Sequence, residues 1–177
     1  MSIDSRQIFL HEKTGREELR TVLSNLLISL IIRPDKVCWL VTPWVTDFQL
    51  LDNRAGEWNT IQSSWESRYI NFSELMIAAV TMGCNLKLIT SDSVINTPFI
   101  EKLNLGIEDK SRYSLSRIDE NVIHTKGLLC SSFFLTGGMN FTYWGTNKRD
   151  DLMTLKINPE DLKQAKLEFE AKYNVMD

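Results

Sequence analysis

Two short stretches in the C-terminal third of the chain carry side chains that suit phosphate chemistry. The first is His124-Thr125-Lys126, which holds one of the two histidines in the sequence. The second is Gly137-Gly138-Met139-Asn140, which follows after an apolar run. Histidine exchanges protons near neutral pH, and lysine and asparagine donate hydrogen bonds to phosphate oxygens. These residue types therefore indicate a site for a phosphate group.

The spacing of the two stretches gives a geometric expectation. We expect residues 121–130 to form a strand. Residues i and i+2 of a strand face the same side, so His124 and Lys126 would project together. The glycine pair would let the backbone approach a ligand closely. Asn140 would then begin the next segment with its amide free to hold a phosphate oxygen.

Each of these residues also has a purely structural interpretation. His124 could be a core histidine with satisfied hydrogen bonds, and Lys126 could be a solvated surface cation. The glycine pair could form only a tight turn, and Asn140 could cap a helix. The second histidine, His11, lies away from any such pattern, and we interpret it as structural or exposed.

Apolar residues at helical spacing predict several helices. The first has a wide apolar face, with Thr14 as its cap and Pro34 just beyond its end. The second ends at Gly83, and the third has Pro98 in its first turn. The predicted helices are 15–32, 72–82, 97–105 and 159–173.

Short runs rich in β-branched and aromatic residues predict the strands. We expect 113–118 and 121–130 to pair with each other. The order of helices and strands predicts an α/β fold, a mixed central β-sheet flanked by helices. A length of 177 residues suits a single domain that spans residues 1–177. The predicted strands are 36–42, 85–90, 113–118, 121–130, 133–136 and 151–157.

Residues 52–70 are polar and without a clear period, yet they carry Trp58, Trp65 and Tyr69. A loop of this length inside a compact domain is often functional. Two interpretations stay open: a surface excursion pinned by its aromatic residues, or the rim of a site or partner surface.

Composition limits the class of protein. The net charge of −3 argues against a broadly basic surface that coats nucleic acid, but it leaves room for a local basic cleft. The polar N-terminus predicts no signal peptide, and the most apolar run is too short for a membrane helix. Cys38, Cys84 and Cys130 are far apart and show no zinc-binding spacing. We therefore expect buried, reduced thiols in a soluble, cytoplasmic protein without a metal site.

The two phosphate-suited stretches resemble the signature of the phospholipase D superfamily, which reads HxK, four residues, Asp, six residues and GSxN. His124, Lys126, Gly137 and Asn140 match it, and the apolar run 127–130 resembles the strand that follows HxK in that family.

Two further positions extend the resemblance. The family usually places an acid about eleven residues after the asparagine, where Asp151 stands, with Asp150 as the neighbouring alternative. Thr42-Pro43-Trp44 resembles the strand end beside the family's site, although Trp44 could also be a core residue.

The chain also departs from the signature. Ser131 or Ser132 replaces the aspartate, the hairpin is one residue shorter, and Gly138 replaces the serine. In the family the aspartate is mainly a structural partner, and the serine adds a hydrogen bond to the phosphate.

The resemblance implies a phospholipase D-like fold and a phosphodiesterase that needs no metal or other cofactor. In the family one histidine attacks phosphorus and a second protonates the leaving oxygen. Because this chain has one HxK motif, the resemblance implies a homodimer in which His124 of both chains face each other. Lys126, Gly138, Asn140 and Trp44 would contact the phosphodiester, and Asp151 would orient the histidine.

The leading hypothesis is thus an endonuclease that acts on DNA, a role that some small family members serve in prokaryotic DNA restriction or phage defence. The alternative is a weak or inactive phosphodiester-binding subunit of a larger DNA-processing assembly, such as one with a translocase ATPase. A lipid-hydrolysing enzyme comes third, because no basic amphipathic helix is evident.

Overall fold

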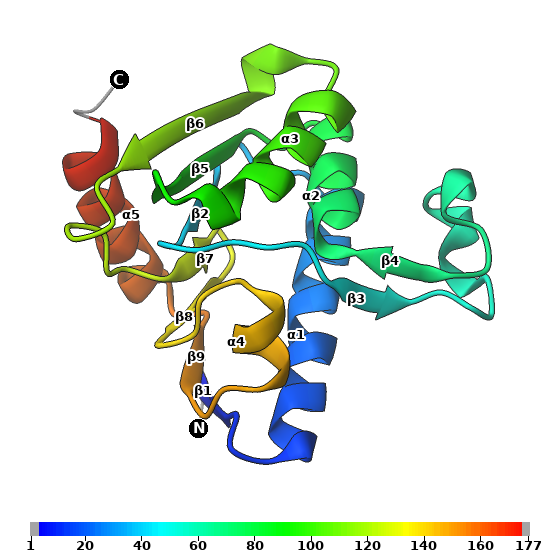
Figure 1. The fold of residues 1–177 in the computed structure, drawn as a ribbon, viewed down its shortest axis with the longest axis horizontal. Helices are drawn as coiled ribbons and strands as arrows, with labels where there is room; N and C mark the ends of the chain where they lie inside the picture. The colour runs from blue at the N-terminus through cyan, green and yellow to red at the C-terminus, as the bar shows by residue number, and fades with distance from the viewer. Residues whose placement is uncertain (1–3, 175–177) are drawn as a thin grey trace.

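A computed structural model describes residues 4–174. Within this range the main sheet has seven strands in the order β1-β9-β8-β7-β2-β5-β6 (Figure 1). A separate two-stranded sheet pairs β3 with β4. The strands are β1 (Ser5–Phe9), β2 (Cys38–Val41), β3 (Gln49–Asp52), β4 (Tyr69–Asn71), β5 (Leu86–Ser91), β6 (Tyr113–Ile118), β7 (Gly127–Leu129), β8 (Phe134–Gly137) and β9 (Leu152–Lys156).

The main sheet is mixed. Strands β2, β5 and β6 run parallel, whereas β7, β8, β9 and β1 continue from β2 in antiparallel pairs. Parallel neighbours need crossover connections, which α2 and α3 supply. The helices are α1 (Lys13–Ile32), α2 (Phe72–Thr81), α3 (Thr97–Gly106), α4 (Tyr143–Asn147) and α5 (Pro159–Tyr173).

Helices cover both faces of the sheet, as the alternation along β2 requires. Cys38 and Leu40 belong to the core cluster that includes buried residues of α1, α2 and α3. Trp39 and Val41 belong to a second cluster, with Leu162 and other buried residues of α5. The predicted α/β fold with a mixed central sheet is therefore confirmed. No helix in residues 4–174 has the length and apolar character needed to cross a membrane.

The segment between α1 and α2 contains the predicted 52–70 excursion, which extends from the body of the molecule beyond β3 and β4 (Figure 1). Trp65 is buried in the main core cluster, and Trp58 packs against it. Arg54 lies over the ring of Tyr69, 4.6 Å from its centroid. The aromatic residues thus anchor the excursion to the domain, which agrees with the first of the two interpretations.

Several sequence-based boundaries were wrong. Residues 121–130 do not form one strand, because β7 begins only at Gly127, and β6 pairs with β5 rather than with β7. Helix α1 begins at Lys13 with Glu12 as its cap, so Thr14 lies in the first turn. Strand β1 was missed because only one of its residues, Ile8, is buried. The short helix α4 was missed as well.

The three cysteines meet in the core, although their sequence spacing gave no sign of it. Cys38 begins β2, Cys84 precedes β5, and Cys130 follows β7. The Cys38 thiol lies close enough to those of Cys84 and Cys130 for both to act on its pKa. All three are buried free thiols, as predicted.

Candidate active site

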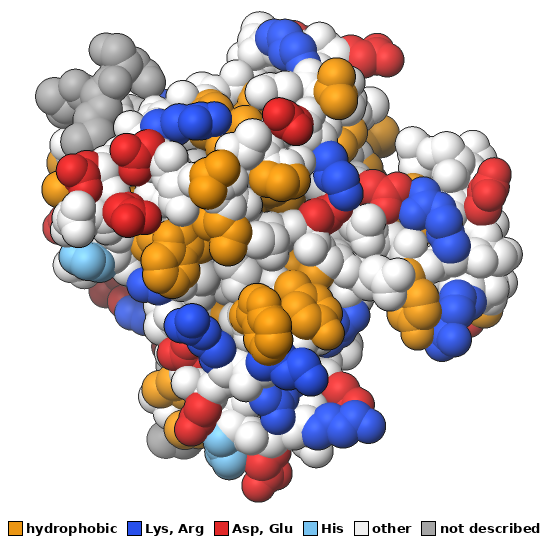
Figure 2. Space-filling model, viewed as in Figure 1, with side chains coloured by type: hydrophobic (Ala, Val, Ile, Leu, Met, Phe, Trp, Pro, Cys, Tyr) orange, Lys and Arg blue, Asp and Glu red, His pale blue; other side chains and the backbone are white. Residues whose placement is uncertain are grey.

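A cleft of about 310 Å³ opens at the C-terminal end of β2, and we call it the candidate cleft. Segments that follow β2, β5, β6 and β8 line it together with α4. Figure 2 shows hydrophobic side chains gathered near the middle of this face, with lysines and arginines beside them. The lining residues are Trp44, Thr46, Ser93, Ile95, Glu120, Asn140, Thr142, Trp144, Gly145, Arg149 and Asp151.

Trp44 lies on the wall of this cleft and is 36% exposed, which agrees with the cleft-wall interpretation rather than the core one. Its segment is held by Asn96, which is fully buried. The Asn96 amide donates to the Pro43 carbonyl at 3.0 Å, and its oxygen accepts from the Val45 amide at 2.8 Å. The same amide also donates to Ser91. Asn96 therefore fixes the chain after β2 against the end of β5.

Asn140 also lines the candidate cleft, just before α4. The Thr42 hydroxyl lies 3.3 Å from Asn140 Oδ1 and 2.8 Å from the Trp44 carbonyl. Residues 45 and 141 form a parallel bridge, and the Thr46 amide donates to the Phe141 carbonyl at 3.1 Å. The two segments are thus joined side by side. Within residues 4–174 the Asn140 amide nitrogen has no hydrogen-bond partner, so it can donate to a ligand.

Asp151 is brought to the same cleft by pairing at the sheet edge, where its carbonyl accepts from the Leu10 amide at 2.8 Å. Its carboxylate lies against the backbone of Gly138. A β-carbon at position 138 would collide with Asp151 Oδ1. The glycine that replaces the family's serine therefore leaves the space that this carboxylate occupies.

His124 and Lys126 are not among the residues that line the candidate cleft. They lie in the connection between β6 and β7, outside any strand, although Glu120 of the same connection lines the cleft. The His124 side chain is exposed, and Lys126 Nζ donates to the His124 carbonyl at 2.9 Å. The Lys126 carbonyl is in turn held by the Thr136 hydroxyl at 2.8 Å. His124 is thus not a core histidine.

The charged residues lining the candidate cleft are Glu120, Arg149 and Asp151. Two carboxylates and one guanidinium give the lining of the candidate cleft a net negative charge. A phosphodiester bound here therefore needs cations from residues that do not line the cleft. Within residues 4–174, no group of three or more histidines, cysteines or acids could hold a metal ion.

Sequence reasoning missed Asn96, Glu120, Trp144 and Arg149. Arg149 carried a signal, because it stands two residues before the predicted acid. Asn96 precedes the first turn of α3 and looks like a helix cap, yet its side chain makes no cap hydrogen bond.

Comparisons with known proteins agree with this fold. The model of the family described as cardiolipin synthase, PLD-like domain, matches residues 59–173. Nuc of Salmonella typhimurium, a phospholipase D family member, has a similar structure, with a TM-score of 0.60 and 13% identity. The similarity covers 96% of this chain and 93% of that one.

NucT of Helicobacter pylori is similar with a TM-score of 0.59 and 12% identity, over 94% of this chain and 93% of that chain. TrmBL2, an archaeal chromatin protein with a novel mode of DNA binding, is similar with a TM-score of 0.60 and 7% identity. That similarity covers 98% of this chain and 53% of TrmBL2. At such low identities these structures show a shared fold. No curated protein matches the sequence.

The family model covers more than half of the 177 residues, and the fold agrees with it independently. The chain therefore belongs to the phospholipase D superfamily.

Proposed function

We propose that this chain is a metal-independent endonuclease whose main substrate is DNA. It cleaves phosphodiester bonds through a phosphohistidine intermediate. One observation carries the proposal: Asn140 and Asp151 line a single cleft bordered by the connection that bears His124 and Lys126. Membership of the superfamily supports phosphodiester chemistry at the same place.

The proposed enzyme is a homodimer. The His124 side chain is exposed and its imidazole has no hydrogen-bond partner within residues 4–174, so a second chain can approach it. The negative charge of the candidate cleft also supports a dimer, because a partner would bring a second Lys126 to the phosphate. Exposed Trp44 and Trp144 on the same face supply apolar area that a partner could cover.

In the proposed reaction, an imidazole nitrogen of one His124 attacks phosphorus. A P–N bond forms while the bond from phosphorus to the leaving oxygen breaks. The His124 of the second chain donates its proton to that oxygen. The same second histidine then takes a proton from water. The water oxygen attacks phosphorus, and the P–N bond to the first histidine breaks.

The remaining residues act on charge and orientation. Lys126 and the Asn140 amide hold the non-bridging oxygens, on which charge develops in the transition state. Gly138 lets the backbone approach the phosphodiester, and Trp44 contacts the nucleotide from the cleft wall. Asp151 orients the imidazole, as carboxylates do in other catalytic histidine sites.

A cleavage assay in EDTA tests this proposal. We expect labelled single- and double-stranded DNA to be cut by the native chain and left intact by His124→Ala. His11→Ala is the matched control, because His11 is the other histidine of the sequence and is also exposed. Equal rates for His124→Ala and the native chain, or cleavage only after magnesium is added, would contradict it.

The structure also favours a second candidate, a phosphodiester-binding subunit with little or no turnover. The Asp151 carboxylate lies where the family's serine would contact a phosphate, and it would repel that phosphate. TrmBL2 has a similar fold and is described as binding DNA. In this form the chain would serve a larger DNA-processing assembly, for example one with a translocase ATPase.

Binding measurements separate the two candidates. A subunit of this kind would bind DNA in EDTA without cutting it, and His124→Ala would leave both the affinity and the absence of turnover unchanged. Either activity is compatible with the role in prokaryotic DNA restriction or phage defence that we propose for the chain. Loss of restriction in cells that express His124→Ala would favour the enzyme over the binding subunit.

A further inference from the structure

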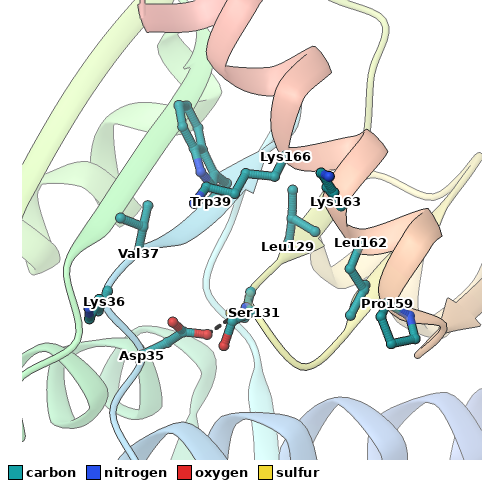
Figure 3. A pocket seen from close by; sticks show the side chains of 11 residues that line it. Asp35, Lys36, Val37, Trp39, Leu129, Ser131, Pro159, Leu162, Lys163 and Lys166 are labelled. Carbon is teal, nitrogen blue, oxygen red and sulfur yellow. Dashed lines mark hydrogen bonds between the residues drawn. The ribbon is translucent and has the colours of Figure 1, made fainter.

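A second cleft, of about 320 Å³, lies between the start of β2, the end of β7 and α5 (Figure 3). We call it the α5 cleft. It shares no lining residue with the candidate cleft. Lys36 and Val37, which line it, precede β2, whereas Trp44 of the candidate cleft follows that strand. The two clefts therefore open at opposite ends of β2.

Lys36, Lys163 and Lys166 place three ammonium groups around the α5 cleft. Lys163 and Lys166 lie one turn apart on α5 and share a face of that helix. Within residues 4–174, Lys36 and Lys163 have no acidic partner, and Lys166 has one contact with Glu170, at 3.8 Å. The whole chain has a net charge of −3, so these lysines form a local excess of cations on an otherwise acidic protein. Such an excess favours an anionic ligand.

Asp35 gives the cleft a second polar end. One of its carboxylate oxygens accepts from the Ser131 amide at 2.5 Å, drawn as a dashed line in Figure 3. The other oxygen has no partner within residues 4–174. Asp35 lies across the cleft from Lys163 and Lys166 (Figure 3). A matching ligand therefore carries an anionic group at one end and a hydrogen-bond donor at the other.

The walls between these two ends are apolar, with Leu129, Leu162 and Pro159 among them. Trp39 also lines the cleft, is only 2% exposed, and has a buried Nε1 without a hydrogen-bond partner among residues 4–174. A buried donor without a partner is uncommon in folded proteins. The Lys166 side chain extends from α5 toward Trp39 (Figure 3).

We propose that the α5 cleft binds a nucleotide. The phosphate lies against Lys163 and Lys166, and the flat base lies between the apolar walls. A ribose hydroxyl or a base amino group donates to Asp35, and a ring nitrogen or sugar oxygen accepts from Trp39 Nε1. A nucleotide combines these features, whereas inorganic phosphate lacks the ring and a fatty acid lacks the donors. The size and apolar lining are typical of small-molecule sites.

Titration of the 15N-labelled protein with AMP tests the proposal, because each of the five tryptophans gives its own indole N–H signal. Trp39→Phe assigns the Trp39 signal by its disappearance. We expect AMP to move the Trp39 signal at lower concentrations than the signals of Trp44 and Trp144, which lie in the candidate cleft. Movement of Trp44 or Trp144 without Trp39, or no movement at all, would overturn the proposal.

Affinities of variants and analogues complete the test. The double variant Lys163→Gln/Lys166→Gln should bind AMP about tenfold more weakly or worse, since it removes both phosphate ligands. Lys172→Gln is the matched control, because Lys172 is also on α5 but does not line the cleft. Adenosine should bind at least about tenfold more weakly than AMP, and inorganic phosphate likewise. Equal affinities of AMP and phosphate, or an unchanged double variant, would refute a nucleotide site. The outcome is independent of cleavage activity.

Discussion

The carboxylate of Asp151 occupies the space next to Gly138 in which a serine side chain would stand. Gly138 directly follows β8 and Asp151 directly precedes β9, and these strands are neighbours in which Gly137 pairs with Met153. Position 138 therefore controls where the acid of the candidate cleft can lie. This relationship explains how the chain departs from its family's signature while keeping an acid in the cleft.

Gly138→Ala should displace the Asp151 carboxylate and slow DNA cleavage by roughly tenfold. Asp151→Asn should slow it as well, and the double variant should lose less than the sum of the two effects in free energy. Cleavage rates of the two single variants and the double variant measure this coupling. Asp150→Asn is the control, because Asp150 is exposed and does not line the cleft. Additive effects would show that the contact has no role in the reaction.

Asn96→Ala should destabilise the fold by about 3 kcal/mol, because it leaves the buried Val45 amide without its acceptor and removes the bonds to the Pro43 and Ser91 carbonyls. The segment that carries Trp44 would lose one of its links to β5, so cleavage should fall too. Urea unfolding of the purified variant measures the loss of stability. Asn104→Ala, an exposed change on α3, should shift the free energy of unfolding by less than about 0.5 kcal/mol. Similar stabilities for the two variants would contradict the bracing role of Asn96.

The stability contributed by Glu74 should depend on pH. Burial opposes its ionisation, yet hydrogen bonds from Arg68 and from the Asn71 amide hold its pKa below the ordinary value of 4.5. A lowered pKa means a contribution that is complete above the ordinary value and is lost as the pH falls through the folded-state value.

Urea midpoints measured from neutral to acidic pH test this dependence. The native chain should exceed Glu74→Gln at neutral pH, and the difference should shrink in acid. Glu101→Gln is the control, since Glu101 is exposed and has no ion pair within residues 4–174. A gap between the native chain and Glu74→Gln that stays constant with pH would refute the role of the carboxylate charge.

The three core thiols should be unreactive in the folded protein. A hydrogen bond with Cys130, together with burial, holds the pKa of the Cys38 thiol well above its usual range. Contact with Cys38 and burial raise the pKa of Cys84, and burial raises that of Cys130. Because the thiolate is the reactive form, iodoacetamide at neutral pH should label none of them until a denaturant is added. Mass spectrometry of the intact protein measures the labelling, and one rapidly modified thiol in the native state would be inconsistent with this packing.

Elements with strong periodicity were predictable from the sequence. Helix α1 has a wide apolar stripe and β2 is entirely buried, so both were recognised with small boundary errors. Strand β1 could not be recognised, because it lies at the sheet edge and its sequence is mostly polar. The pairing of β6 was wrong because the crossover through α3 places it parallel to β5, and periodicity does not report strand order.

The candidate site was predictable where its residues lie in one local pattern, as Asn140 and Asp151 do. Residues that act through tertiary contacts were not: Asn96 reaches the site across the end of β5, and Arg149 belongs to a short run of charges. The expected projection of His124 and Lys126 from a strand failed because the strand begins only at Gly127.

Mixing of native and His124→Ala chains tests the shared site most directly. If each site needs His124 from two chains, subunit exchange at equal amounts leaves about a quarter of the dimers active. The mixture should then cleave DNA in EDTA at about a quarter of the rate of the same total amount of native protein. A rate of about half would show that each chain works alone, and this would contradict the proposed dimer site.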